Sequence, residues 1–211
     1  MAARVVVVHP QTPERRLLAQ AAAAITAGGV IAYPTDSSYA LGCRLADKAA
    51  AERLRRLRGA DRHHPFTLVC RDLSEIATYA QVDNPSYRLL RSLTPGPYTF
   101  VLPATREVPR RLMHPKRKTI GIRVPDHPVA MALLEVLDQP LMSTTVMGDS
   151  AEEPLADAQT VALAYGSTLD LILDGGPTPA EPTTVLELSG GRVKVLRQGR
   201  GAIGDWAVEG G

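Results

Sequence analysis

Short apolar runs alternate with longer segments of helical periodicity along most of the chain. Leu17, Ala21 and Ile25 recur at helical spacing, with Thr12 and Pro13 before them and two glycines after them, so we expect a helix that Thr12 caps and Gly28 ends. Residues 30–33 are uniformly apolar and predict a buried strand. The same pattern predicts further strands at residues 5–9, 66–70, 98–102, 119–124, 141–145 and 169–173.

Helices are predicted between most of these strands, at residues 47–58, 72–79, 84–93, 128–137 and 157–165. Two last strands, at residues 184–188 and 193–197, are joined by Ser189, Gly190 and Gly191, which is the turn chemistry of a hairpin. Strands separated by helices favour an open sheet covered by helices, and the hairpin makes that sheet mixed. The predicted fold class is therefore α/β.

Composition is consistent with one domain over residues 1–211. Hydrophobic residues make up 45% of the 211, and the 17 glycines and 17 prolines are spread along the chain, so no linker is marked. The apolar run near the start is too short for a signal peptide or a membrane span, and Cys43 and Cys70 lack metal-ligand spacing. We expect a cytoplasmic protein with no membrane partner, no bound metal and two buried thiols.

The net charge of +2 does not by itself indicate a polyanionic partner, but the basic residues are unevenly distributed. Two stretches contain many of them, and each is either a solvated face or a surface that faces phosphate groups. The first stretch comprises Arg53, Arg55, Arg56, Arg58, Arg62, His63 and His64, and the second comprises Arg106, Arg110, Arg111, Lys116, Arg117 and Lys118.

The chain contains no Walker-type phosphate loop, no dinucleotide-binding glycine motif, no serine nucleophile elbow and no zinc-protease motif. A phosphate compound would therefore be bound by scattered arginines and hydroxyls. Such groups occur at predicted strand ends, in the polar loop 34–39, at residues 143–145, at residues 183–184 and at Arg197. Arg123 ends another strand and either binds a carboxylate or phosphate of a ligand or pairs with an acid such as Asp126 or Asp174.

Three longer segments resemble elements of the Sua5/YrdC/YciO family. Residues 33–42 read YPTDSSYALG, against Y-P-T-D/E-T-x-Y-G-L-G in the family. Residues 94–102 read TPGPYTFVL, and residues 121–128 read GIRVPDHP, both close to family elements. Shorter matches follow in family order at residues 174–176, 182–185 and 197–199, so the resemblance spans roughly residues 10–203.

The resemblance implies a twisted open mixed sheet with flanking helices and a large, positively lined cavity. It also implies a reaction: L-threonine, bicarbonate and ATP condense to threonylcarbamoyl-AMP and pyrophosphate, a step toward the t6A modification of tRNA. ATP is then a substrate, and Mg²⁺ would accompany it. By resemblance, Thr35, Tyr39 and Arg123 bind threonine, Thr183 and Arg197 bind the nucleotide, and Arg58 and Thr145 serve both the nucleotide and catalysis.

The sequence departs from the family's K-x-R and S-x-N signature. Arg58 stands at the Lys position, Ala60 at the Arg position, Thr145 at the Ser position and Met147 at the Asn position. This pattern resembles the YciO-like branch of the family. Ala60 and Met147 can neither pair with a phosphate nor hydrogen-bond strongly, so one alternative is a weakly active synthase. With the two basic stretches, the same change allows a paralogue that binds double-stranded RNA or nucleotide without turnover. Transfer to another acceptor is a third alternative, since Ser37 stands where many relatives have Thr.

The resemblance also bears on the organisation of the protein. The chain ends at Gly211, and we expect it to lack the extra C-terminal domain of longer family members. RNA or tRNA is a further candidate partner, and both a monomer and a dimer remain open.

Overall fold

The computed structural model describes residues 3–59, 66–148 and 153–206. Its strands are β1 (Arg4–Val7), β2 (Ile31–Pro34), β3 (Tyr39–Arg44), β4 (Thr67–Val69), β5 (Tyr98–Pro103), β6 (Thr119–Arg123), β7 (Leu141–Thr145), β8 (Leu171–Asp174), β9 (Thr184–Ser189) and β10 (Arg192–Arg197). Its helices are α1 (Arg15–Thr26), α2 (Lys48–Leu57), α3 (Leu73–Tyr79), α4 (Asn84–Leu93), α5 (Pro128–Leu137) and α6 (Ala158–Tyr165), with a 3-10 turn, η1 (Arg110–Leu112).

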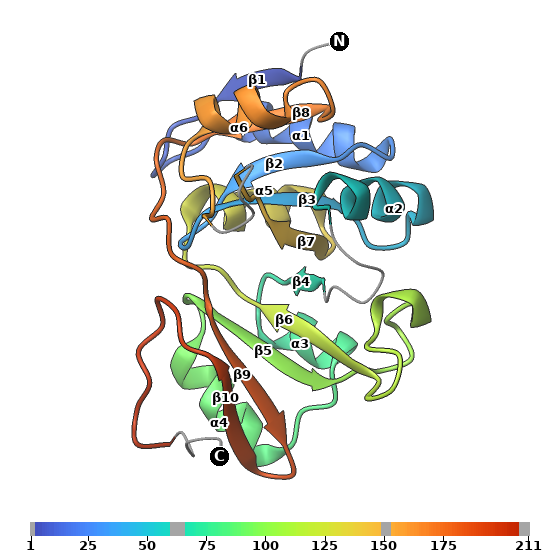
Figure 1. Ribbon diagram of the computed structural model, residues 1–211, viewed down its shortest axis with the longest axis vertical. Coiled ribbons are helices and arrows are strands. Elements are labelled where there is room, and N and C mark those ends of the chain that lie inside the picture. The colour runs from blue at the N-terminus through green and yellow to red at the C-terminus, as the bar shows by residue number, and fades with distance from the viewer. Residues whose placement is uncertain (1–2, 60–65, 149–152, 207–211) are drawn as a thin grey trace.

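All these strands form one twisted sheet in the order β1-β8-β2-β3-β7-β4-β6-β5-β9-β10 (Figure 1). Parallel pairs join β1 to β8, β8 to β2, β4 to β6 and β5 to β9. The other neighbours are antiparallel. This arrangement confirms the prediction of a mixed α/β sheet with flanking helices.

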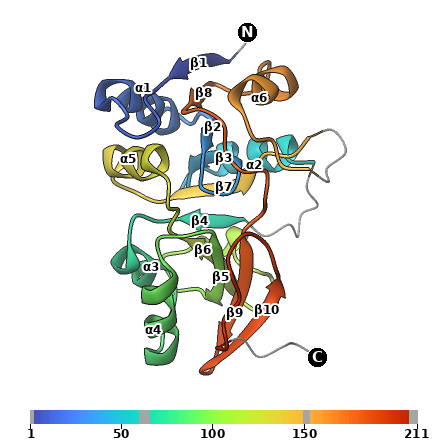
Figure 2. The same cartoon turned by 90° about the vertical axis from the view of Figure 1, so that its left-hand side faces the viewer.

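The helices cover both faces of the first half of the sheet. Helices α1 and α5 pack together on one face, and Figure 2 shows them opposite α2 and α6. Leu18 and Leu133 are buried with Tyr33 in one apolar cluster. Leu54 and Val161, from α2 and α6, are buried in a second cluster on the other face. Burial of these large side chains from water is the main favourable contribution to folding.

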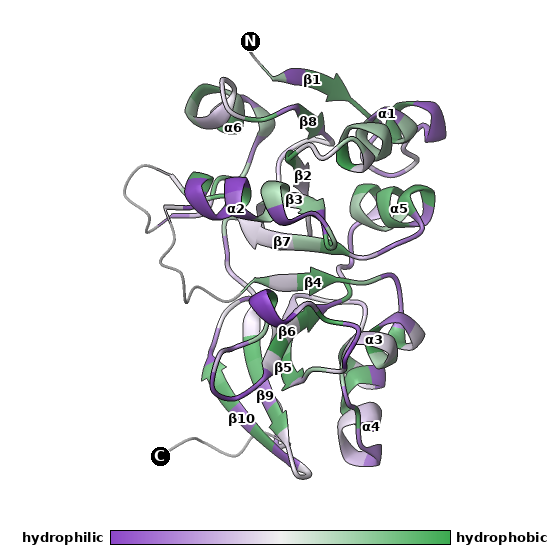
Figure 3. Ribbon diagram, turned by 90° about the vertical axis from the view of Figure 1, so that its right-hand side faces the viewer, coloured by the Kyte–Doolittle hydropathy of each residue, from purple (hydrophilic) through white to green (hydrophobic). Residues whose placement is uncertain are grey.

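Figure 3 shows that α5 is mostly hydrophobic, whereas α2 is largely hydrophilic. Helix α5 buries much of its surface against α1 and the sheet. Helix α2 buries only one stripe, of Ala50, Ala51 and Leu54, so its remaining positions are available to charged residues. This difference places the arginine-rich stretch on a helix with one buried face.

Aspartate side chains cap four of the helices. Each accepts a hydrogen bond from the backbone N–H three residues ahead, which satisfies one of the unpaired donors of the first turn. These pairs are Asp47 with Ala50, Asp72 with Glu75, Asp83 with Ser86 and Asp157 with Thr160, at 2.8–2.9 Å. The Glu75 carboxylate accepts from the N–H of Arg71, one residue before the position that a complete capping box uses.

The start of α1 differs from the prediction. The helix begins at Arg15 after Glu14, two residues later than a Thr12 cap requires. The backbone N–H and hydroxyl of Thr12 instead contact Nδ1 of His9, at 3.0 and 2.9 Å. Thr12 therefore belongs to a turn after β1 and does not cap the helix.

Strand β3 was missed by the apolar pattern. It returns antiparallel to β2 after the four-residue loop 35–38, and small or polar residues such as Ala40, Gly42 and Arg44 hide its strand character. A Cβ at Gly42 would lie 2.9 Å from Cε1 of Tyr33. Glycine is therefore required where β3 passes the Tyr33 ring.

The closing hairpin agrees with the prediction. β9 and β10 are antiparallel and flank Gly190 and Gly191, which both have positive φ, as a two-residue type I′ turn requires. Within the described ranges, no helix is long and apolar enough to cross a membrane.

Candidate functional site

A cavity of about 700 Å³ opens between the loop after β2, the end of α2, the middle strands of the sheet and the C-terminal hairpin. Among the described residues that line it, no side chain is acidic and six are arginines. Clustered cations beside low-dielectric walls produce a positive potential that attracts anions. These arginines are Arg55, Arg58, Arg111, Arg117, Arg123 and Arg197.

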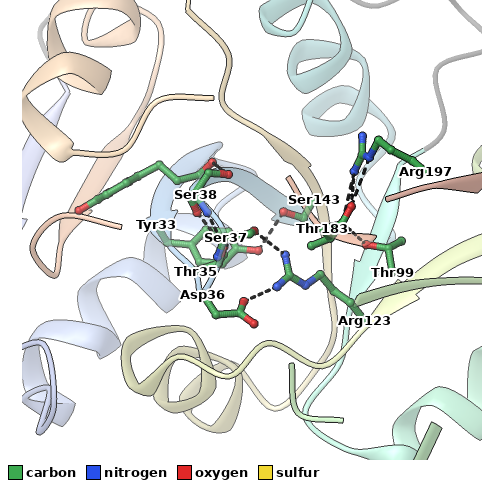
Figure 4. A network of polar contacts seen from close by, with 11 residues as sticks. Tyr33, Thr35, Asp36, Ser37, Ser38, Thr99, Arg123, Ser143, Thr183 and Arg197 are labelled. Atoms are coloured by element: carbon green, nitrogen blue, oxygen red, sulfur yellow. Dashed lines mark hydrogen bonds and ion pairs between the residues drawn. The ribbon is translucent and has the colours of Figure 1, made fainter. Parts of the chain in front are cut away.

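At one side of the cavity, Thr35, Asp36, Ser37 and Arg123 form a buried unit that we call the Arg123 corner (Figure 4). Arg123 ends β6, and its Nη1 donates to Oγ of Ser37 at 3.1 Å while its Nη2 pairs with the Asp36 carboxylate. The Thr35 hydroxyl donates to the carbonyl of Ser38 at 2.7 Å, which closes the loop. The corner is thus held by its own hydrogen bonds before any ligand arrives.

The Arg123 side chain is 9% exposed and that of Asp36 is 10% exposed, so this ion pair is largely removed from water. From the sequence, Arg123 either binds a ligand or pairs with an acid such as Asp126 or Asp174. The structure pairs it with Asp36. A guanidinium has five N–H donors. Nε of Arg123 is buried without a hydrogen-bond partner within the described residues. Arg123 therefore keeps capacity for a second carboxylate.

Tyr33 and Ser143 lie beside the corner. Ser143 is among the strand-end hydroxyls that the sequence indicated at residues 143–145, whereas Tyr33 was not singled out as a site residue. The Ser143 hydroxyl donates to the carbonyl of Leu41 at 2.7 Å, so at 2.9 Å it accepts from the Tyr33 hydroxyl. Burial raises the pKa of Tyr33 to about 12. Tyr33 is therefore a neutral, fixed part of the cavity wall at ordinary pH.

Tyr39 is not among the described residues that line the cavity. It is fully buried, and its hydroxyl donates to the carbonyl of Gly176 at 2.9 Å. Burial raises the pKa of this hydroxyl above its ordinary value. Tyr39 thus supports the loop from the core side, and its contact with threonine stays a prediction.

On another side of the cavity, Thr183, Thr99 and Arg197 form a second polar group (Figure 4). The Thr183 and Thr99 hydroxyls lie 2.8 Å apart, and Arg197 donates to the Thr183 carbonyl from Nη2 at 2.9 Å and from Nε at 3.2 Å. Burial lowers the pKa of Arg197 from its usual value, but an arginine stays cationic in proteins. Thr99 was missed because threonine is common in strands.

The end of α2 contributes Arg55 and Arg58, and we call these two residues with Phe66 the α2 rim. Nε of each arginine is buried without a hydrogen-bond partner within the described ranges. Thr145, at the end of β7, also lines the cavity, as does Met147. The structure therefore gathers Arg58, Thr145 and Met147 around one space, while Ala60 lies outside the described residues.

The two basic stretches divide between the cavity and the surface. Arg55 and Arg58 line the cavity, Arg56 is exposed, and Arg53 pairs with Asp170 at 2.7 Å. In the second stretch Arg111 and Arg117 line the cavity. The residues Arg62, His63 and His64 lie outside the described part of the chain. Neither stretch is therefore wholly a solvated face.

The cavity brings together all but one of the predicted site residues, namely Thr35, Arg58, Arg123, Thr145, Thr183 and Arg197, and leaves out Tyr39. In the part of the chain that the structure describes, no three His, Cys, Asp or Glu side chains are grouped to hold a metal ion. The arrangement suits a ligand with several anionic groups, because arginines from several separate elements line one cavity.

Comparison with known proteins agrees with this geometry. A family model named for Sua5, YciO and YrdC and described as "Telomere recombination" matches residues 23–199. The "Uncharacterized protein YciO" of Escherichia coli (strain K12) is 48% identical over 196 residues, which cover 93% of this chain and 95% of that protein. A threonylcarbamoyl-AMP synthase of Nitrosococcus oceani is 37% identical over 156 residues, which cover 74% of this chain and 83% of that protein.

Solved structures show the same fold. The crystal structure of E. coli YciO superimposes with a TM-score of 0.93 at 46% identity, over 97% of this chain and 99% of that one. P. abyssi Sua5 complexed with L-threonine gives a TM-score of 0.84 at 26% identity, over 92% of this chain and 57% of that one. The chain therefore belongs to the Sua5/YciO/YrdC family.

Proposed function

We propose that the protein condenses L-threonine, bicarbonate and ATP into threonylcarbamoyl-AMP and pyrophosphate, for the t6A modification of tRNA. The observation that carries the proposal is one cavity, lined by arginines without acids among the described residues, that joins the Arg123 corner to Arg58, Thr183 and Arg197. Curated relatives are named threonylcarbamoyl-AMP synthases, and a related structure is complexed with L-threonine.

The threonine carboxylate would bind Arg123 through the donors that Asp36 and Ser37 leave open. A guanidinium fork matches a carboxylate in shape and charge, so this contact fixes both position and orientation. The hydroxyls of Thr35 and Ser37, 3.1 Å apart, lie beside that position. They would orient the threonine in the cavity.

The chemistry follows from the atoms of the three substrates. The threonine amine attacks the bicarbonate carbon and gives a carbamate with loss of water. A carbamate oxygen then attacks the α-phosphorus of ATP, the bond to the bridging oxygen of the β-phosphate breaks, and pyrophosphate leaves. Negative charge develops on the phosphates, where Arg58 and Arg197 would stabilise it. Thr145 and Thr183 would hold the nucleotide, and Mg²⁺ arrives with ATP as part of the substrate.

Met147 favours a slow enzyme. Its side chain lines the cavity, and a thioether is only a weak hydrogen-bond acceptor. Each absent charge-assisted contact costs on the order of 1.5–3 kcal/mol, which corresponds to roughly one to two powers of ten in rate. The proposal is therefore a synthase with weak activity.

The test is mass-spectrometric detection of threonylcarbamoyl-AMP from the purified chain with threonine, bicarbonate, ATP and Mg²⁺. The matched controls are the Arg123→Ala variant, shown to be folded by circular dichroism at the assay temperature, and a reaction without threonine. Product that disappears in both controls is the expected result. No product from folded protein, at concentrations well above trace contamination, would refute the synthase.

The same cavity supports a second candidate, a protein that binds double-stranded RNA or nucleotide without turnover. The observation in its favour is the exposed basic segment at residues 116–118, which continues from the cavity lining at Arg111 and His114. Its signature is affinity for an RNA duplex that falls steeply as salt rises, with no dependence on threonine. That outcome, together with no product, would replace the synthase by this candidate.

A further inference from the structure

The four arginines near the end of α2 point in different directions, because successive residues of a helix are about 100° apart. Relative to the buried Leu54, Arg53 lies on one flank and Arg55 and Arg58 lie on the other, about 60° from each other. Arg56 lies on the back of the helix. The contacts agree with this geometry: Arg53 pairs with Asp170, Arg56 is exposed, and Arg55 and Arg58 line the cavity.

Arg55 is positioned by an aromatic ring. Its Cζ lies 5.0 Å from the centroid of the Phe66 ring, within the range of a cation–π contact. Phe66 is 2% exposed and belongs to the second apolar cluster, with Leu54 and Leu68. The ring is therefore held by the core, and the guanidinium rests on a fixed surface.

The guanidinium of Arg55 faces a space without compensating charge. Its Nε is buried and has no hydrogen-bond partner within the described residues, and no described acid lines the cavity. A buried polar group without a partner is costly, and a charged one more so. An anionic ligand in the cavity that Arg55 lines would supply the missing counter-charge.

We propose that Arg55, oriented by the Phe66 ring, binds the polyphosphate chain of a nucleotide beside Arg58. The inference rests on the proposed function for the identity of the nucleotide, but it concerns which residues bind it. Two guanidinium groups one helical turn apart can contact neighbouring phosphate groups, because each carries several donors in one plane. Arg55 is a binding residue in this scheme, and Phe66 is a positioning residue.

The experiment is calorimetric titration of the full chain with ATP and, separately, with inorganic tripolyphosphate. Arg55→Ala should weaken binding of both probes by roughly tenfold to a hundredfold, since a charge-assisted hydrogen bond is lost. Arg56→Ala removes the same charge from the exposed back of the same helix and should change affinity less than about twofold. Arg55→Lys keeps the charge without the planar fork and should give an intermediate affinity.

Phe66→Leu tests the positioning role. It keeps an apolar residue in the core but removes the ring, and it should weaken tripolyphosphate binding by roughly threefold to thirtyfold. In the double variant with Arg55→Ala it should cause no further loss of tripolyphosphate affinity, because the ring acts only through that arginine. Additive losses in the double variant would show that Phe66 acts only through general packing and would overturn this part of the proposal.

Several results would overturn the proposal as a whole. One is an Arg55→Ala variant that is folded by circular dichroism and still binds tripolyphosphate with wild-type affinity. Another is a loss of affinity in Arg56→Ala equal to that in Arg55→Ala. Wild-type protein that binds neither probe at millimolar concentration would refute both proposals. If the affinity depends on Arg55 but no threonylcarbamoyl-AMP forms, the phosphate site stands and only the synthase fails.

Discussion

The Arg123 corner and the α2 rim are both arginine sites on one cavity, but they differ in how far the protein itself satisfies them. At the corner, Arg123 is 9% exposed and already contacts Asp36 and Ser37. At the rim, Nε of both Arg55 and Arg58 lacks a hydrogen-bond partner within the described residues. The corner has an internal counterion and the rim, on the described residues, does not.

This difference separates stability from binding. A buried charge that has a partner becomes strongly destabilising when that partner is removed, because its desolvation is no longer compensated. A charge that has no such partner can be removed without destabilising the fold, because no counterion is left behind, although a ligand then loses a contact. We therefore expect substitutions at the corner to change both folding and binding, and substitutions of the two rim arginines to change binding without destabilising the fold.

The largest effect is expected for Arg123→Ala. The substitution leaves the Asp36 carboxylate buried without its counterion, so the free energy of unfolding should fall by about 3–5 kcal/mol. Urea unfolding followed by circular dichroism measures this change. The double variant with Asp36→Ala should recover part of the loss, and a loss below about 1 kcal/mol in the single variant would show that the corner is not a stabilising unit.

Next in size is a pH dependence from Tyr33, beside the corner. Burial raises its pKa to about 12 from an ordinary value of 10.0, so between these two values the folded state holds a proton that the unfolded state has lost. The contribution is complete below pH 10 and is lost as the pH rises toward 12, about 3 kcal/mol in total. The free energy of unfolding, measured with urea from pH 8 to 11, should therefore fall less steeply for Tyr33→Phe than for the wild type. Equal slopes would contradict the buried position of this hydroxyl.

At the rim, Arg58→Ala should weaken ATP binding by about tenfold to a hundredfold. The free energy of unfolding should fall by no more than about 0.5 kcal/mol, because no described partner is left behind. Calorimetry and urea unfolding on the same sample compare the two quantities, with Arg56→Ala as the matched surface control. A clear loss of stability would show that Arg58 is a structural residue, like Arg123.

The smallest effect is expected for Thr99→Val, in the polar group of Thr183 and Arg197 on another side of the cavity. It removes the hydrogen bond to the Thr183 hydroxyl and should cost about 0.5–1.5 kcal/mol of unfolding free energy. Arg197 still donates to the Thr183 carbonyl, so ATP affinity should fall only severalfold. Binding that is abolished would mean that Thr99 itself contacts the ligand.

Most elements of the fold could be predicted because their signals are local. The helices at residues 84–93 and 128–137 and the strand at residues 141–145 have the predicted bounds, since apolar period, caps and turn residues are all read within a few positions. The strand Tyr39–Arg44 could not be predicted in this way. Its small and polar residues are stabilised by pairing with β2 and β7, partners that no local pattern contains.

Asp36 shows the same limit at the site. The sequence offered Asp126 and Asp174 as acids for Arg123, and the structure selects Asp36, 87 positions away. The distance between the ends of β2 and β6 depends on the order and twist of the strands between them. No spacing in the sequence encodes that distance.

The sequence by itself determined the class of the fold, the hairpin at Gly190 and Gly191, and the supply of hydroxyls and arginines at strand ends, because each depends on neighbours along the chain. Only the tertiary structure decided that Arg55 and Arg58 face the cavity while Arg53 and Arg56 do not. Helical spacing separates these four residues, but the packing of Leu54 against the sheet decides which flank meets the cavity. The four arginines carry the same charge in the sequence, and packing decides which of them can contact a ligand in the cavity.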